Sequence, residues 1–62
     1  MKVRDVIKLI ERDGWYLERT RGSHRQYRSN VKPGTVTVAG HPSDEMPRGT
    51  LNSVLKQAGL KK

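Results

Sequence analysis

The sequence contains no cysteine, no long hydrophobic run and few acidic residues. Without cysteine, disulfide bonds, thiolate zinc sites and a cysteine nucleophile are all excluded. No apolar stretch approaches the ~20 residues that a membrane-spanning helix needs. The N-terminus, MKVRDVIKLIERD, is too highly charged to be a signal peptide. We therefore expect a cytoplasmic protein that makes no contact with a membrane.

The small number of acidic residues leaves a strong positive charge on a short chain. Thirteen lysines and arginines stand against six aspartates and glutamates, a formal net charge of +7 over 62 residues. This length predicts one small domain, residues 1–62, which on folding buries only about 60% of the surface of the unfolded chain. A polyanion is the leading partner hypothesis. The alternative is that some small domains are simply basic.

Two segments have the hydrophobic spacing of amphipathic helices. In the first, the apolar residues Val3, Val6, Ile7 and Ile10 recur at i, i+3, i+4 and i+7. Gly14 follows them as a residue that can end a helix in the left-handed conformation. This pattern predicts a helix over residues 3–13. The second helix begins with Pro47 at its first position and carries Leu51, Val54, Leu55 and Ala58. Gly59 and Leu60 are typical of a Schellman cap, and we expect Lys61 and Lys62 to form a frayed tail.

Between the two helices the sequence predicts three strands. In residues 15–20 two sets of side chains alternate with a period of two, which predicts the first strand. Gly22-Ser23 interrupts the pattern, and residues 24–29 form a second strand. Residues 35–39 form the third. The short connections favour antiparallel pairing, because parallel neighbours need a crossover of a dozen residues or more.

The expected fold is α+β, in the order α-β-β-β-α, with a three-stranded antiparallel sheet that has both helices on one face. Alternation assigns to the covered face Trp15, Leu17, Tyr27, Val36 and Val38. It assigns to the polar, open face Tyr16, Glu18, Thr20, His24, Gln26, Arg28, Thr35 and Thr37. On the open face Tyr16 offers a surface on which a base can stack, whereas Trp15 has the spacing of a core residue.

Four arginines lie within ten residues around the interruption Gly22-Ser23 and the histidine that follows it: Arg19, Arg21, Arg25 and Arg28. Arginine presents planar, bidentate donors that match phosphate oxygens. Glycine allows a backbone to approach closely, and histidine is the side chain that ordinarily titrates near neutral pH. These residue types suit a site that binds a phosphodiester and moves a proton beside it. The alternative is a solvated, cationic strand edge that resists aggregation.

Several motifs together resemble the HicA family, the mRNA-interferase toxins of HicA–HicB toxin–antitoxin pairs. They are Gly22-Ser23-His24, Arg25-Gln26-Tyr27, Thr35-Val36-Thr37-Val38, Gly40-His41, Gly49-Thr50-Leu51 and Lys56-Gln57-Ala58-Gly59-Leu60. The resemblance extends over almost the whole chain. It departs at Trp15, where many members have phenylalanine, and at Ala39, where many have proline, so the resemblance does not establish the substrate preference.

The resemblance implies a fold like that of double-stranded-RNA-binding domains and endoribonuclease activity that needs neither metal nor other cofactor. It implies that His24 is the catalytic residue, acting on mRNA, and that a HicB-type antitoxin neutralises the protein. Because RNA supplies its own 2′-hydroxyl nucleophile, the enzyme needs only a base, an acid and positive charge. The candidate RNA-binding residues are Arg19, Arg21, Gly22, Ser23, Arg25 and Arg28. We expect the cleaved segment to be single-stranded.

The second acid–base role stays open between His41 and water. His41, Asp44 and Glu45 lie within one five-residue loop and make a poor metal site. The simpler interpretation is that the two carboxylates stabilise the N-terminus of the following helix, where negative charge is favourable. Two other functions also stay open: a non-catalytic RNA-binding module, and a basic module that binds an acidic protein.

Overall fold

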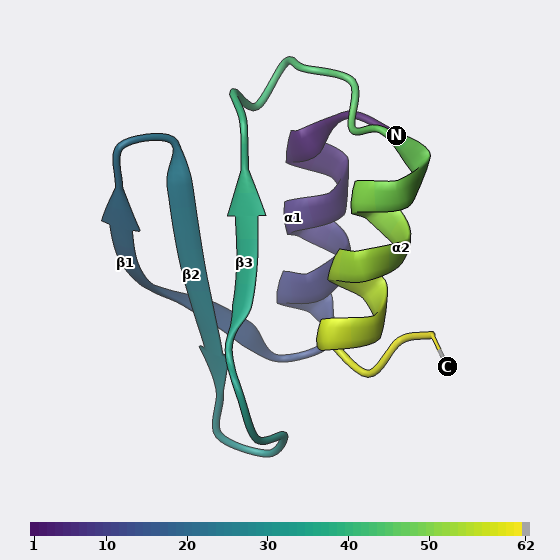
Figure 1. Cartoon of the computed structure of the whole chain (residues 1–62). Helices are drawn as coiled ribbons and strands as arrows, with labels where there is room; N and C mark the ends of the chain where they lie inside the picture. Colours follow the sequence, from purple (N-terminus) through teal and green to yellow (C-terminus); the bar gives the residue numbers. More distant parts are fainter. Residues whose placement is uncertain (62) are drawn as a thin grey trace.

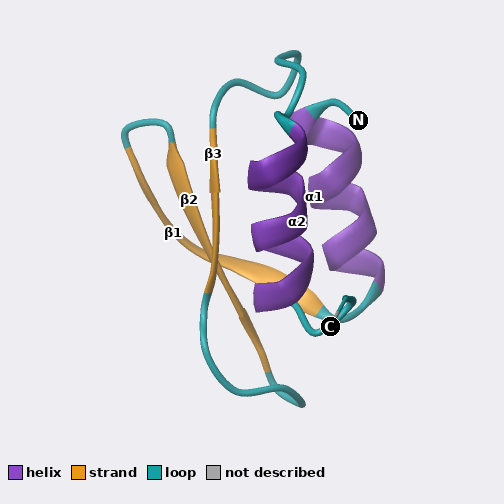
Figure 2. Cartoon of the chain, turned by 45° about the vertical axis from the view of Figure 1, so that its right-hand side comes forward, coloured by secondary structure: helices purple, strands orange, loops and turns teal. Residues whose placement is uncertain are grey.

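The computed structural model describes residues 1–61 and confirms the expected α+β fold. The elements are α1 (Val3–Arg12), β1 (Trp15–Arg21), β2 (His24–Ser29), β3 (Val36–Ala39) and α2 (Arg48–Gln57). The strands form one antiparallel sheet in the order β1-β2-β3, and both helices lie side by side on one face of it (Figure 1, Figure 2). In the described part of the chain, no helix is long and apolar enough to span a bilayer.

The element boundaries differ from the sequence prediction by one residue. Asp13 is the C-cap of α1 rather than its last residue, and Pro47 is the N-cap of α2 rather than its first residue. The third strand begins at Val36 instead of Thr35. At the expected tail, Lys61 donates from Nζ to Asn52 Oδ1 (2.7 Å), and Lys62 lies outside the described residues.

Both predicted helix stops are confirmed. Gly14 has φ +100° and Gly59 has φ +73°, a backbone region that favours glycine. At the end of α2 the Gly59 N–H donates to Lys56 O (3.1 Å) and the Leu60 N–H donates to Leu55 O (2.9 Å). These two hydrogen bonds are the pair that defines a Schellman motif.

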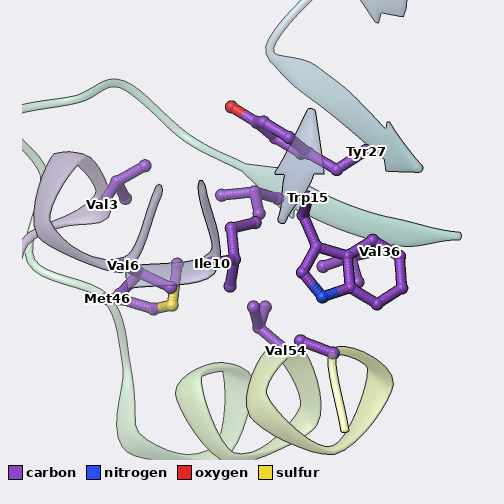
Figure 3. Close-up of a cluster of buried hydrophobic side chains, with 10 residues drawn as sticks. Val3, Val6, Ile10, Trp15, Tyr27, Val36, Met46 and Val54 are labelled. Carbon is purple, nitrogen blue, oxygen red and sulfur yellow. The ribbon is translucent and has the colours of Figure 1, made fainter. Parts of the chain in front are cut away.

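The hydrophobic core lies between the helices and the covered face of the sheet (Figure 3). Its buried residues are Val3, Val6, Ile10, Trp15, Tyr27, Val36, Val38, Met46, Val54 and Ala58. All but Met46 were expected from the periodicity. Met46 belongs to the segment between β3 and α2, where no repeat marks it, and its N–H donates to Met1 O (2.9 Å).

Strand β1 corrects the predicted alternation. Trp15 pairs with Ser29 and Leu17 with Tyr27, but the next pair joins Arg19 to Gln26, so Glu18 is an extra residue in a β-bulge. After the bulge, Thr20 pairs with Arg25. Since Arg25 also pairs with the buried Val38, Thr20 lies on the helix side, opposite to the prediction.

Leu17 was expected in the core, and this prediction is wrong. The residue is on the helix side of the sheet, since it pairs with the buried Tyr27, yet its side chain is 49% exposed. The cause is the course of β1, which starts beside the end of α1 and leads away from both helices (Figure 1, Figure 2). Trp15, at the start of the strand, is therefore covered, whereas Leu17 is not.

Two loops fasten the helices at their opposite ends. Lys32 Nζ donates to Asp13 Oδ2 (2.5 Å) and to Ala58 O (3.1 Å), so one ammonium group joins the C-caps of both helices, where positive charge is favourable. At the other end, Asp44 O and Pro42 O accept from the first N–H groups of α1. The N-terminal amine also donates to Glu45 Oε2 (2.6 Å), and this interaction lowers the pKa of Glu45.

Candidate active site

The candidate catalytic histidine is the first residue of β2, immediately after the tight turn that joins β1 to β2. Arg21 and His24 form the last pair of the ladder, and Gly22-Ser23 are the two residues between them. Gly22 has φ +56°, whereas among residues 1–61 only glycines have a positive φ. Positive φ at the first central position alone is the signature of a type II′ turn, whose twist matches that of the flanking strands. The Gly-Ser-His sequence thus determines locally where the histidine stands.

The side chain of His24 belongs to the open face of the sheet, as predicted. Along β2 it alternates with Arg25, which lies on the helix side, and it pairs with Arg21 and with Ala39. His24 and Arg21 are both exposed. The imidazole is therefore accessible at the tip of the hairpin, with a guanidinium group as its cross-strand neighbour.

The bulge brings two predicted phosphate-binding side chains to this same face. Because Glu18 is the extra residue, Arg19 pairs with Gln26 and Arg21 with His24, although strict alternation from Trp15 assigns both arginines to the helix side. At the far end of the ladder Tyr16 pairs with Arg28. Three of the four clustered arginines thus share the open face with His24.

Arg25 is the exception among the candidate RNA-binding residues. Its Nη1 donates to Gly40 O (2.8 Å), and the side chain is half-buried on the helix side of the sheet. The structure therefore does not bring Arg25 together with the other candidates. Its hydrogen bond instead fastens the end of β3 to β2, beside the loop that carries His41.

Gly22 and Ser23 are both exposed in the turn. A Cβ built on Gly22 meets no heavy atom within 4 Å, so a bound chain has free access to the backbone here. Among the described residues no pocket is found. The candidate site is the open sheet surface itself, with the turn at one end.

The loop with His41 lies at the same end of the sheet as the β1–β2 turn (Figure 1). Its connections, however, run to the helix layer. The His41 N–H donates to Asp44 Oδ2 (3.1 Å), and the next residues contribute the carbonyls that cap α1. Within residues 1–61 no three His, Asp or Glu side chains group closely enough to hold one metal ion.

Tyr27 is on the opposite face of the sheet from His24. It is 2% exposed, and burial, followed by the nearby Glu11 carboxylate, raises the pKa of its phenol above the usual tyrosine value. The prediction that Tyr27 lies away from the histidine is therefore confirmed.

Sequence reasoning missed the bulge, and with it the placement of Arg19 and Arg21. Residues 18–21, Glu-Arg-Thr-Arg, contain no apolar side chain. A hydrophobic residue after Leu17 would have revealed the change of parity, but an all-polar segment fits either face equally well. Only the cross-strand pairing decides the question.

Comparison with known proteins agrees with the motifs. None of the curated proteins compared matches the chain. The model of one protein family, described as "HicA toxin of bacterial toxin-antitoxin", matches residues 3–60. That match covers nearly the whole chain, including both helices, all three strands and the turn that carries His24. The protein therefore belongs to the HicA family of toxins from bacterial toxin–antitoxin systems.

Proposed function

We propose that residues 1–62 form a single-domain mRNA interferase, a cytoplasmic endoribonuclease that uses His24 and requires neither metal nor other cofactor. The observation that carries this proposal is the juxtaposition on one exposed surface of His24 with Arg21, its cross-strand partner, and Arg19, on the same face of β1. A proton-transfer group and fixed positive charge are what RNA cleavage requires of a protein, because the substrate contains its own nucleophile.

The reaction is an intramolecular transfer. The ribose 2′-oxygen attacks the adjacent phosphorus, its proton passes to the His24 imidazole, and the bond from phosphorus to the 5′-oxygen breaks. One fragment ends in a 2′,3′-cyclic phosphate and the other in a 5′-hydroxyl, whose proton comes from water. Proton transfer by a positioned side chain contributes typically ~10²–10⁴-fold. The guanidinium groups of Arg19 and Arg21 stabilise the charge that develops on the phosphorane oxygens.

We assign to water the proton that the leaving 5′-oxygen receives, because His41 belongs to the helix side of the molecule. Its loop is hydrogen-bonded to the N-terminus of α1 and to Arg25 through Gly40, whereas His24 is on the open face of the sheet. The turn supplies the remaining contacts to RNA. Gly22 lets the phosphodiester backbone approach closely, and the exposed Ser23 donates from its hydroxyl group.

A HicB-type antitoxin is the proposed partner, and it neutralises the toxin by covering His24. Acidic groups of such a protein would bind the arginines of the open face in place of phosphate. Residues 15–29 contain four arginines and one acidic residue, so charge complementarity favours an anionic partner. Binding would also stabilise this small domain by mass action.

The test compares two exposed histidines at the same end of the sheet. Purified wild-type protein, His24→Ala and His41→Ala are incubated in EDTA with a defined, unstructured RNA. We expect His24→Ala to lose ~10²-fold or more in cleavage rate and His41→Ala to retain it. Because both side chains are exposed, each variant should keep its free energy of unfolding within about 0.5 kcal/mol.

Equal cleavage by wild type and His24→Ala would overturn the proposal. Binding of RNA without any product, at any pH and with any divalent metal added, would instead indicate a non-catalytic RNA-binding module. Negligible affinity for RNA together with tight binding of an acidic protein would indicate a protein-interaction module. A loss in His41→Ala as large as that in His24→Ala would assign the second proton role to His41.

A further inference from the structure

Tyr16 is a large aromatic residue on the open face of the sheet, and it packs against neither helix. Its side chain is 45% exposed, in contrast to the 2% of Tyr27 on the covered face. The cross-strand partner of Tyr16 is Arg28, at the end of the β1–β2 ladder that is remote from the turn. An exposed aromatic ring beside a guanidinium group therefore marks the far end of the same face that carries His24.

The bulge makes this face continuous. On β1 the open-face side chains are Tyr16, Arg19 and Arg21, and on β2 they are Arg28, Gln26 and His24, paired in that order. If the present sequence of β1 alternated strictly, Tyr16 would share its face with Glu18 and Thr20 instead of the two arginines. Aromatic and cationic side chains thus run along one surface, from the far end of the hairpin to its tip.

This combination is characteristic of surfaces that bind single-stranded nucleic acid. Cationic side chains follow the phosphates, and aromatic rings stack on successive bases whatever their sequence. A duplex presents its phosphates but keeps its base faces stacked inside, so an exposed ring gains little from it. An unpaired strand offers both groups, which makes it the occupant that the open face fits.

We propose that Tyr16 stacks on a base of single-stranded RNA, with Arg28 beside it on a neighbouring phosphate, as a binding subsite remote from the cleaved bond. This inference rests on the proposed function, because the cleaved bond is placed at His24. Arg28 is four residues from His24 along β2, which is roughly 13 Å at ~3.3 Å per residue. That distance spans about four nucleotides at the ~3.4 Å spacing of stacked bases, so a dinucleotide held at His24 cannot reach Tyr16.

The experiment measures cleavage of an unstructured RNA octamer and of a dinucleotide by wild type, Tyr16→Ala, Tyr16→Phe and Leu17→Ala. Leu17 is the matched control, because it is the next residue, is 49% exposed and lies on the other face. Loss of one stacked base weakens binding by about 5- to 150-fold. We therefore expect Tyr16→Ala to raise KM for the octamer by that factor without changing kcat.

The other expected results follow from the distance between Tyr16 and His24 and from the aromatic ring that Tyr16→Phe retains. Tyr16→Ala should cleave the dinucleotide like wild type, and Tyr16→Phe and Leu17→Ala should retain the wild-type KM for the octamer. An octamer annealed to its complement should be cleaved much more slowly than the single strand. The inference fails if Tyr16→Ala leaves KM for the octamer unchanged, if it impairs both substrates equally, or if the duplex is cleaved as well as the single strand.

A binding measurement separates this inference from the proposed function. The affinity of a fluorescently labelled octamer is measured for His24→Ala and for the double variant His24→Ala/Tyr16→Ala, so that cleavage plays no part. If the wild type cleaves no RNA but the double variant binds the octamer 5- to 150-fold more weakly, the proposed function fails and the stacking site stands. If the double variant instead loses affinity only for an acidic protein partner, the stacking inference is overturned.

Discussion

Tyr16 and Tyr27 lie on neighbouring strands of one hairpin, yet the structure uses the two residues in opposite ways. Tyr27 faces the helices, is almost completely buried and joins the core with Val36, whereas Tyr16 faces away and remains exposed beside Arg28. The same side chain thus contributes to stability on one face of the sheet and is available for binding on the other. What differs is only the parity of the position and the presence of a covering helix.

The β1–β2 hairpin also differs from the α1 segment in its charge. The segment around α1, residues 2–13, carries four basic and three acidic residues, which nearly balance. The β1–β2 hairpin, residues 15–29, carries four arginines and only Glu18 as an acid. The hairpin is therefore more positive than the α1 segment, and three of its four arginines lie on the face that presents His24, which favours encounter with a polyanion at that face.

The largest expected difference between the two faces is in stability. Tyr27→Ala removes a buried aromatic ring and should cost about 3–5 kcal/mol, a large part of the roughly 3–9 kcal/mol expected of a domain of this size. Tyr16→Ala should cost less than about 1 kcal/mol. Urea unfolding followed by circular dichroism measures both, and similar losses in the two variants would contradict the assignment of the faces.

A second comparison removes one positive charge from the open face of the sheet and one from the loop that joins the helix ends. Arg21→Met should weaken binding of single-stranded RNA about tenfold. It should also make the slope of log K against log salt concentration shallower by about 0.7. Lys32→Met removes the ammonium group that joins Asp13 and Ala58 O, so it should instead cost about 1 kcal/mol of stability. Binding titrations at several salt concentrations and urea unfolding separate the two effects. Equal losses of RNA affinity in the two variants would show that total charge, not its position, controls binding.

The smallest expected effect comes from deleting Glu18. As the extra residue of the bulge, Glu18 can be removed without changing which side chains of β1 share the open face, so KM for the RNA octamer should stay within about threefold of wild type. Deleting Thr20 is the control, because it also closes the bulge but brings Arg19 opposite Arg25, on the helix side, and puts Glu18 opposite Gln26 in its place. If deletion of Glu18 is as damaging as deletion of Thr20, the bulge itself has a role that the register does not reveal.

Sequence reasoning was most successful where one short segment determines the outcome. Both helical stripes, the Schellman cap at Gly59 and the turn at Gly22 depend on neighbouring residues, and all were predicted. It failed where a distant group decides. Leu17 has the right parity for the core but no helix above it, and Arg19 and Arg21 change face through a bulge that only the pairing with β2 defines.

The amino-acid sequence by itself determined the order of the elements, the covered face of the sheet and the position of His24 next to a glycine-containing turn. Hydrophobic periodicity and the conformational freedom of glycine act over a few residues, so they can be recognised without a structure. Tertiary structure alone decided that Arg19 and Arg21 join Tyr16 and His24 on one face. The four residues from Glu18 to Arg21 are all polar and bury nothing, so their register is set by pairing with β2 and not by their own pattern.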